Sequence, residues 1–288
     1  MSIGLALAGG GMQGVAHIGA IKALEELGIK VDYISGTSSG SIFATMYAMG
    51  FTTEEMFEIV DKYYKSLIDV EKMPIAKAVG TYILQKEIKL GGLIKGEKVE
   101  ELVTKIADKK GIKNIADIQM PLAIPTVDTI STKECISISK RYNLQDDQID
   151  YIYDIPIATA VRASMAFPGI YTTCNFGKYN FIDGGTKDNL PVNILKLMGA
   201  DKVIALSFDI TNYTPSENIL NILLRAVDIF SLKDVRKAQK QADIAIEIQN
   251  DDTSLLQTDN LQKCYQIGYD TIMKHREKIE QLKETIQI

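Results

Sequence analysis

The sequence predicts an α/β protein with a largely parallel sheet. Two short apolar runs, Ile3–Ala8 and Val31–Ser35, alternate with segments of helical spacing. Each run stops at a cluster of small residues, as strands do where they turn directly into helices. The chain has 288 residues, of which 46% are hydrophobic. That length allows a large buried core, and this composition excludes a disordered chain.

The first part of the chain predicts elements with clear ends. Val15–Leu27 has helical spacing and stops at Gly28, and the small-residue helix Ser41–Met49 stops at Gly50, a residue typical of helix C-caps. Thr53 is a suitable N-cap for a helix over Glu54–Ser66. A further periodic helix, Glu97–Lys109, follows Gly96.

The second part predicts strands and helices in alternation. Pro191 fits a helix start, since proline is tolerated in the first helical turn. The predicted strands are Leu122–Val127, Cys135–Ser139, the hairpin of Tyr171–Phe176 with Tyr179–Ile182, Val203–Phe208 and Ile244–Ile248. The predicted helices are Ile155–Ser164, the segment after Pro191, the amphipathic Ile219–Phe230 and the closing Asn260–Thr285.

We expect a single domain over residues 1–288, because no linker, repeat or low-complexity tract interrupts it. Residues 65–98 carry seven Lys against four acids together with scattered aliphatic residues, which suggests a cap or lid. A solvated helical excursion is an equal alternative. Residues 210–288 are expected to be a C-terminal extension packed on the domain.

Charge and composition narrow the class of function. Lys plus Arg number 32 and Asp plus Glu 37, a net charge of −5, which argues against nucleic acid as the main partner. The cysteines are odd in number and lack a CxxC pair, so neither disulfides nor zinc are expected. They are Cys135, Cys174 and Cys264. With two histidines in the chain, a His-rich metal centre is also not expected, whereas carboxylate sites for magnesium or calcium stay open.

Two long uncharged stretches, residues 1–21 and 33–53, do not have the pattern of membrane or signal segments. The first lacks a basic start and is interrupted by glycines, and the second is rich in Ser, Thr and Gly. Neither is typical of a signal peptide or a spanning helix. A cytoplasmic protein is therefore expected.

The run Gly36-Thr37-Ser38-Ser39-Gly40 is a GxSxG pattern between a predicted strand and a predicted helix. A nucleophilic serine on such a sharp turn needs tiny neighbours two residues away on each side. The pattern therefore suggests Ser38 as a nucleophile, with Gly36 and Gly40 giving room to the turn. A purely structural Ser/Gly turn is the alternative.

A serine hydroxyl needs a base, and the two histidines are poorly placed for that role. His17 and His275 both lie within predicted helices, where a histidine is usually a packed or surface residue. A carboxylate is the remaining option. Asp183 is the strongest candidate, because it ends an apolar strand and is followed by Gly184 and Gly185. The alternative is an Asp-Gly turn.

The loop Gly9-Gly10-Gly11-Met12-Gln13-Gly14 lies between the first strand and the first helix. Its backbone N–H groups could face a phosphate or a developing oxyanion at a helix N-terminus. The loop also matches GxGxxG, with Asp32 at a suitable distance for a ribose-binding acid. However, Asp32 begins the second apolar run, whereas a ribose-binding acid belongs at the end of that strand. This placement disfavours a dinucleotide site.

Taken in order, these motifs closely resemble the patatin-like phospholipase family over about residues 3–209. The resembling segments are Ala8–Gly14, His17–Glu26, Gly36–Gly40, Ala163–Pro168, Asp183–Gly185, Asn189–Val192 and Gly199–Asp201. The resemblance implies a three-layer α/β/α fold and a Ser-Asp dyad without histidine. It implies Ser38 as nucleophile and Asp183 as base.

The resemblance also assigns the Gly9–Gly14 loop, including Gly10, Gly11, Met12 and Gln13, to the oxyanion hole. It implies hydrolysis of acyl esters of phospholipids or neutral lipids through an acyl-enzyme, with no metal or other cofactor. Peripheral contact with a membrane is expected for such a substrate. Gln13 departs from the family pattern, which usually has Arg or Lys there. A phosphate- or nucleotide-binding module and a catalytically weak family member are the alternatives.

Overall fold

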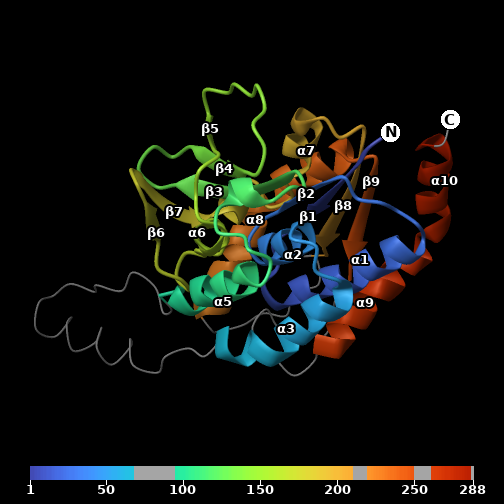
Figure 1. Ribbon diagram of the computed structural model, residues 1–288, viewed down its shortest axis with the longest axis horizontal. Coiled ribbons are helices and arrows are strands. Elements are labelled where there is room, and N and C mark those ends of the chain that lie inside the picture. Colours follow the sequence, from blue (N-terminus) through green and yellow to red (C-terminus); the bar gives the residue numbers. More distant parts are fainter. Residues whose placement is uncertain (68–94, 210–218, 250–260, 287–288) are drawn as a thin grey trace, which may run out of the picture.

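The computed structural model describes residues 1–67, 95–209, 219–249 and 261–286 (Figure 1). The predicted cap or lid over 65–98 lies outside this part of the chain, apart from its first and last few residues. No helix within the described ranges has the length and apolar character needed to cross a bilayer.

The described strands form one mostly parallel sheet in the order β5-β4-β3-β2-β1-β8-β9, with β7 antiparallel to β3 and β6 antiparallel to β7. The strands are β1 (Ile3–Leu7), β2 (Tyr33–Gly36), β3 (Leu122–Asp128), β4 (Glu134–Ile138), β5 (Ile149–Ile152), β6 (Cys174–Phe176), β7 (Tyr179–Asp183), β8 (Lys202–Phe208) and β9 (Ile244–Ile248). The predicted α/β class is confirmed.

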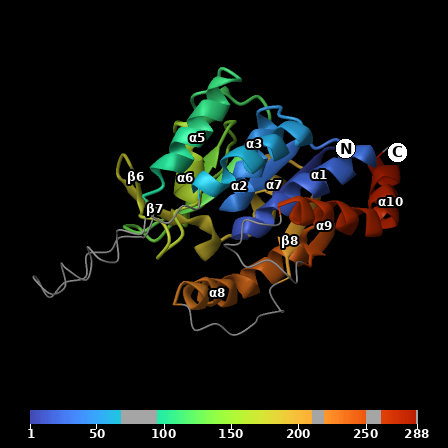
Figure 2. The same cartoon turned by 90° about the horizontal axis from the view of Figure 1, so that it is seen from below.

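Helices cover the sheet on both faces and complete the three layers (Figures 1 and 2). The longer helices are α1 (Ala16–Glu26), α2 (Ser39–Ala48), α3 (Thr53–Leu67), α5 (Glu97–Asp108), α6 (Ile157–Ser164), α7 (Val192–Met198), α8 (Ile219–Gln241), α9 (Leu261–Lys274) and α10 (Arg276–Ile286). The connection from β1 leads to β2, toward one edge of the sheet. The connection from β8 leads to β9, toward the other edge. Right-handed crossovers in opposite directions place α1 and α8 on opposite faces. In Figure 2, α8 lies on the side opposite α3 and α5.

The central strands explain the position of the site. All five residues of β1 are buried, as expected for a parallel strand covered on both faces. Leu7 of β1 is paired with Gly36 of β2 and with Leu206 of β8. The loops that follow these strands therefore meet at one edge of the sheet, where parallel α/β folds present their functional groups.

Most predicted elements are confirmed, and several ends differ for local reasons. The N-cap of α3 is Thr52 and not Thr53, because Thr52 and Glu55 exchange the two bonds of a capping box. The helix ends predicted at Gly28 and Gly50 are confirmed, but the C-caps are Leu27 and Met49. The glycines follow these C-caps and have the positive φ values typical of that next position. β6 begins only at Cys174, since Tyr171 instead donates its N–H to Phe167 in a turn.

Three further differences lie in the later half of the chain. β5 was not predicted; three of its four residues are partly exposed, Ile152 is buried, and the segment carries no apolar run. The amphipathic helix predicted over 219–230 continues to Gln241 as α8. The closing helix is divided at His275 into α9 and α10.

The C-terminal helices pack on the first helix of the chain through two glycines. A Cβ atom on Gly19 of α1 would collide with the backbone of Tyr265, and one on Gly268 of α9 would collide with the backbone of Ala16. The two helix backbones therefore touch directly. Ile272 of α9 is fully buried in the same core as β1.

Candidate active site

Ser38 lies in a strained turn between β2 and α2. Its φ of 53° and ψ of −126° are conformations that non-glycine residues rarely adopt. Such strain at the junction of a strand and a helix is typical of a nucleophile turn, because it raises the side chain above the sheet edge.

The glycines on each side of Ser38 make this turn possible. A Cβ atom on Gly40 would lie 2.5 Å from the carbonyl oxygen of Leu7 and 2.7 Å from that of Ala8. A Cβ atom on Gly36 would collide with the Gly40 backbone. A side chain at either position would therefore displace the backbone of this turn.

A buried hydroxyl group holds the backbone of Ser38 in place. The Ser38 N–H donates to Ser164 Oγ at 3.0 Å, and Ser164 Oγ donates to the carbonyl oxygen of Pro125 at 2.8 Å. Ser164 is completely buried at the end of α6. It links the strained turn to β3, the strand that pairs with β7. Sequence reasoning did not single out Ser164, although it lies in one of the resembling motifs.

Asp183 ends β7 and is 1% exposed. Its Oδ1 accepts the Gly185 N–H at 2.8 Å, while Oδ2 has no hydrogen-bond partner within the described part of the chain. Burial raises the pKa of Asp183 to about 7, against the lowering effects of the Ser38 hydroxyl and the Gly185 N–H. The Ser38 side chain is thus close enough to influence this carboxyl group, and the free Oδ2 is available to accept a proton.

The glycine loop lies directly against Ser38. A Cβ atom on Gly9 would be 2.8 Å from the Ser38 Cβ and 2.6 Å from Asn189 Oδ1. The Gly9 N–H donates to the Asn189 carbonyl oxygen at 3.3 Å. The fold therefore brings the predicted oxyanion loop and the predicted nucleophile together, with Asn189 fixing the loop.

The donors of this loop are not equivalent. The Gly10 N–H donates to Ser39 Oγ at 3.1 Å, and the Gln13 N–H donates to the Gly10 carbonyl oxygen. Met12 is buried in the core. The N–H groups of Gly11 and Ser39 have no acceptor among the described residues. The loop predicted as one unit is thus divided into donors already engaged and donors that remain available.

Two further glycines, Gly14 of the glycine loop and Gly184 after Asp183, allow close packing around the Ser38 turn. A Cβ atom on Gly14 would lie 2.7 Å from Ser39 Oγ, and one on Gly184 would collide with the Pro125 carbonyl. Both glycines therefore let the glycine loop and the Asp183 turn approach the structures that hold Ser38.

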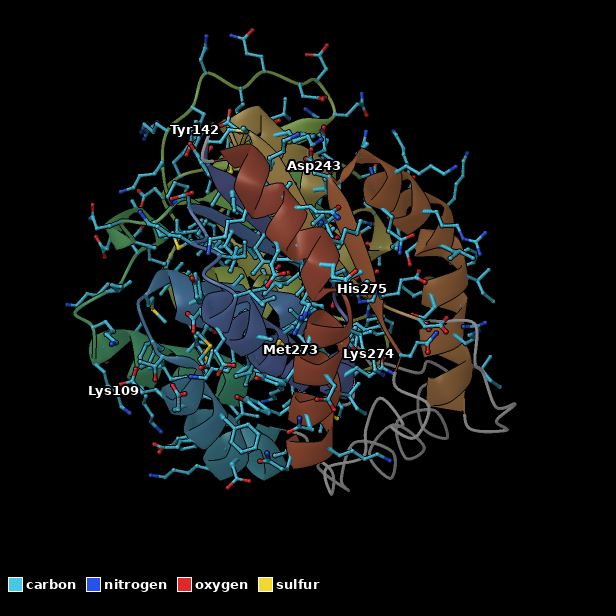
Figure 3. The ribbon with its side chains drawn as sticks, turned by 90° about the vertical axis from the view of Figure 1, so that its right-hand side faces the viewer. Lys109, Tyr142, Asp243, Met273, Lys274 and His275 are labelled. Carbon is cyan, nitrogen blue, oxygen red and sulfur yellow. The ribbon has the colours of Figure 1, made fainter. Side chains whose placement is uncertain are left out.

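Neither histidine is placed to serve as a base for Ser38. His17 is fully buried, its Nε2 is 2.9 Å from the Ala8 carbonyl oxygen, and its ring packs on Phe208. Burial lowers the pKa of His17 to about 4. His275 is exposed between α9 and α10 (Figure 3). The expectation that both are packed or surface residues is confirmed.

Asp32 lies at the opposite end of β2 from the glycine loop. Its Oδ2 accepts the Ile3 N–H at 3.0 Å, at the start of β1. A ribose held by this carboxylate would be at the wrong edge of the sheet. The geometry therefore agrees with the sequence in disfavouring a dinucleotide site.

A separate open hollow of about 750 Å³ lies between β9 and α9. Figure 3 shows Lys274 and His275, which border it. None of its lining residues belongs to the Ser38 site.

A strained serine turn at the carboxyl edge of a mostly parallel sheet, facing a buried carboxyl group, defines a class of α/β proteins built around a nucleophile elbow. A model of the family described as patatin-like phospholipase matches residues 5–196. The chain belongs to this family.

Relatives agree with this assignment. Lysophospholipase NTE1 of Candida albicans is 28% identical over 207 residues, covering 71% of this chain but 13% of its own length. The uncharacterized protein YqhO of Bacillus subtilis is 27% identical over 199 residues, covering 64% of this chain and 63% of YqhO. The chain thus spans a small part of the first relative and under two thirds of the second.

The fold is also similar to a solved structure. VipD from Legionella pneumophila aligns with a TM-score of 0.51 and 15% identity, covering 96% of this chain and 67% of VipD. The three-layer fold implied by the resemblance is confirmed. The family model is described as patatin-like phospholipase, and the Candida albicans relative is named a lysophospholipase.

Proposed function

We propose that this chain hydrolyses fatty acyl esters of phospholipids or lysophospholipids through a Ser-Asp dyad. The observation that carries the proposal is the strained Ser38 beside Asp183, a buried carboxyl group with one oxygen left unpaired. The pKa of Asp183, raised to about 7, is well matched to a general base that operates near neutral pH.

In the proposed first step, Asp183 Oδ2 takes the proton of Ser38 Oγ as Oγ attacks the ester carbonyl carbon. The carbonyl π bond opens and places a negative charge on oxygen. When the tetrahedral intermediate collapses, the C–O bond to the leaving alcohol breaks. The Asp183 proton passes to that alcohol, which leaves an acyl-Ser38 ester.

The N–H groups of Gly11 and Ser39 are the proposed oxyanion donors, since both lack an acceptor among the described residues. The Gly10 N–H joins them if the Ser39 hydroxyl gives up its bond to that group. These donors carry no net charge, and Gln13 adds none. The site therefore relies on backbone dipoles and the N-terminus of α2 to stabilise the oxyanion.

In the second half of the reaction, Asp183 takes a proton from water, whose oxygen attacks the acyl carbonyl carbon. Collapse of the second intermediate breaks the bond to Ser38 Oγ, which recovers its proton from Asp183 and releases the fatty acid. All of these steps use groups of the chain itself. A chelator is accordingly expected to leave turnover unchanged.

Labelling with a fluorophosphonate probe and turnover of a short-chain p-nitrophenyl ester test this proposal. Ser38→Ala is expected to abolish labelling, and Asp183→Asn is expected to lower kcat by roughly 10⁴, the scale of lost base assistance in serine hydrolases. Circular dichroism must show that both variants are folded.

Ser131→Ala is the matched control, because the Ser131 hydroxyl also donates to a carboxylate, Asp128, at 2.6 Å but lies in an ordinary loop. It is expected to retain wild-type labelling and turnover. Near-normal activity of folded Ser38→Ala would exclude the dyad. If wild type failed to label or turn over any ester, the chain would be a catalytically weak member of its family.

A further inference from the structure

Helix α8 exposes large apolar side chains to solvent. Within the described part of the chain, six large hydrophobic side chains are exposed, and three of them lie on this helix. Phe230 is 75% exposed, Ile229 is 56% exposed and Ile222 is 45% exposed. An exposed apolar cluster of this kind marks a surface that meets another partner.

The exposure follows the period of the helix. Ser231 and Ala238, seven residues apart, are buried and face the rest of the protein. On the opposite side, the exposed apolar residues are followed along the same stripe by exposed cations. These are Lys233, Arg236, Lys237 and Lys240. We refer to Ile222, Ile229, Phe230 and these cations as the α8 stripe.

The charge of α8 is opposite to that of the whole protein. Residues 219–241 contain five Lys or Arg and two Asp, a net charge of +3, whereas the chain has a net charge of −5. A cationic stripe with apolar side chains at one end complements the anionic head groups and the acyl region of a lipid bilayer. An apolar protein partner would not require the cations of the α8 stripe.

The topology places Ile222, in the first turns of α8, at the active-site edge of the sheet. The segment after α8 returns to the beginning of β8, where the Asp243 N–H donates to the Val203 carbonyl oxygen. The helix has 23 residues and spans about 34 Å, whereas the seven residues of β8 span about 23 Å. The first turns of α8 therefore extend past the carboxyl edge, and the helix packs against the turn that follows Asp183.

We propose that the α8 stripe docks this protein on an anionic lipid bilayer. Ile222, Ile229 and Phe230 enter the interface, and the cations contact lipid phosphates beside them. Because Ile222 lies at the active-site edge, this docking brings that edge next to the lipid from which the substrate is drawn. This inference rests on the proposed lipid hydrolase function and adds the surface through which the substrate is reached.

Flotation with non-hydrolysable ether-lipid vesicles tests the docking apart from catalysis. Vesicles of phosphatidylcholine alone are compared with vesicles containing 30% phosphatidylglycerol. Wild type is expected to float with the anionic vesicles and to be released by 0.5 M NaCl. Ile229→Ser/Phe230→Ser and Lys233→Gln/Arg236→Gln/Lys237→Gln are each expected to weaken vesicle binding by tenfold or more.

Matched controls change the same chemistry elsewhere. Ile130→Ser/Leu197→Ser replaces exposed apolar side chains outside α8, and Lys98→Gln/Lys105→Gln/Lys109→Gln removes cations from α5 and its C-cap. Both controls are expected to bind vesicles as wild type does. All variants are expected to hydrolyse a soluble short-chain ester at the wild-type rate, which reports on the proposed catalysis independently of docking.

Equal vesicle binding by the α8 variants and wild type would overturn the proposal, as would failure of wild type to bind. Analytical ultracentrifugation tests whether a second copy of this protein, and not a bilayer, covers the α8 stripe. A wild-type dimer that Ile229→Ser/Phe230→Ser converts to a monomer would also overturn the proposal. If wild type bound vesicles but did not turn over the ester, the hydrolase function would be refuted. The docking surface would still be supported.

Discussion

At the scale of single residues, the protonation of Asp183 controls the proposed reaction. The ionised carboxylate is the form that accepts the Ser38 proton, and burial raises the pKa of Asp183 to about 7. Activity should therefore rise with pH through about 7. Below this value, kcat/KM for a soluble ester is expected to fall tenfold per pH unit. A pH profile that stays flat down to pH 5 would contradict Asp183 as the base.

The same burial has a cost in folding stability. The unfolded Asp183 carboxyl loses its proton near its ordinary pKa of 3.8, whereas the folded one keeps it to about 7. The folded state is therefore favoured below pH 4, and this advantage is lost as the pH rises to about 7.

Asp183→Asn removes the buried charge and is expected to stabilise the protein at pH 8, by up to about 4 kcal/mol from the pKa difference. The gain should shrink at pH 5. Thermal unfolding at both pH values measures it. Asp128→Asn is the control, because Asp128 is also buried, but hydrogen bonds from Ser131 and Asn180 outweigh burial and lower its pKa. That control should be destabilised at pH 8.

Ser164 is expected to position the nucleophile. Ser164→Ala leaves the part-buried Ser38 N–H without its acceptor, which costs about 1 kcal/mol. Because the Ser38 turn is strained, we expect slower fluorophosphonate labelling and a lower kcat, by about tenfold or more, with KM little changed.

Ser137→Ala is a matched control for Ser164→Ala, since Ser137 is also a buried serine and its Oγ has no partner among the described residues. It should label at the wild-type rate. If Ser164→Ala lowered the melting temperature without slowing labelling, Ser164 would be a structural residue alone.

At the scale of elements, the contact between α1 and α9 depends on the absence of side chains. Gly268→Ala would push a methyl group into the Ala16 backbone, so the helices must separate. We expect a loss of about 1–3 kcal/mol of stability and a lower melting temperature. Gln262→Ala on the exposed side of α9 is the control and should have little effect. An unchanged melting temperature for Gly268→Ala would mean that α9 contributes little to the fold.

At the scale of the whole molecule, the segment after residue 209 shares the main core. Ile244, Ile246 and Ile248 of β9 are buried against β8, and Ile272 of α9 lies in the same cluster. A chain ending at residue 209 would expose these surfaces of β8 and α1. We expect it to be insoluble or to lack cooperative unfolding, as judged by calorimetry. Cooperative unfolding of this fragment would show that residues 210–288 are a separable extension.

Much of the fold follows from local sequence patterns. The apolar run of β1 and the glycines at 28 and 50 act through their immediate neighbours, and the strand and the two helix ends predicted from them are confirmed. β5 was missed because it is a strand of four residues, three of them partly exposed, and it has no continuous apolar run. The break at His275 was missed because no proline or glycine marks it.

The sequence by itself determined most of the elements, and it singled out the serine turn and Asp183 as the candidate site. Only the tertiary structure decided which groups meet. Ser38 and Ser164 are 126 residues apart, and their hydrogen bond depends on the order of β2, β3 and α6 in space. Likewise, the raised pKa of Asp183 arises from its burial, and the engagement of the Gly10 N–H arises from the approach of Ser39. Local patterns reflect interactions between chain neighbours, whereas proximity, burial and hydrogen-bond partners depend on the packing of distant segments.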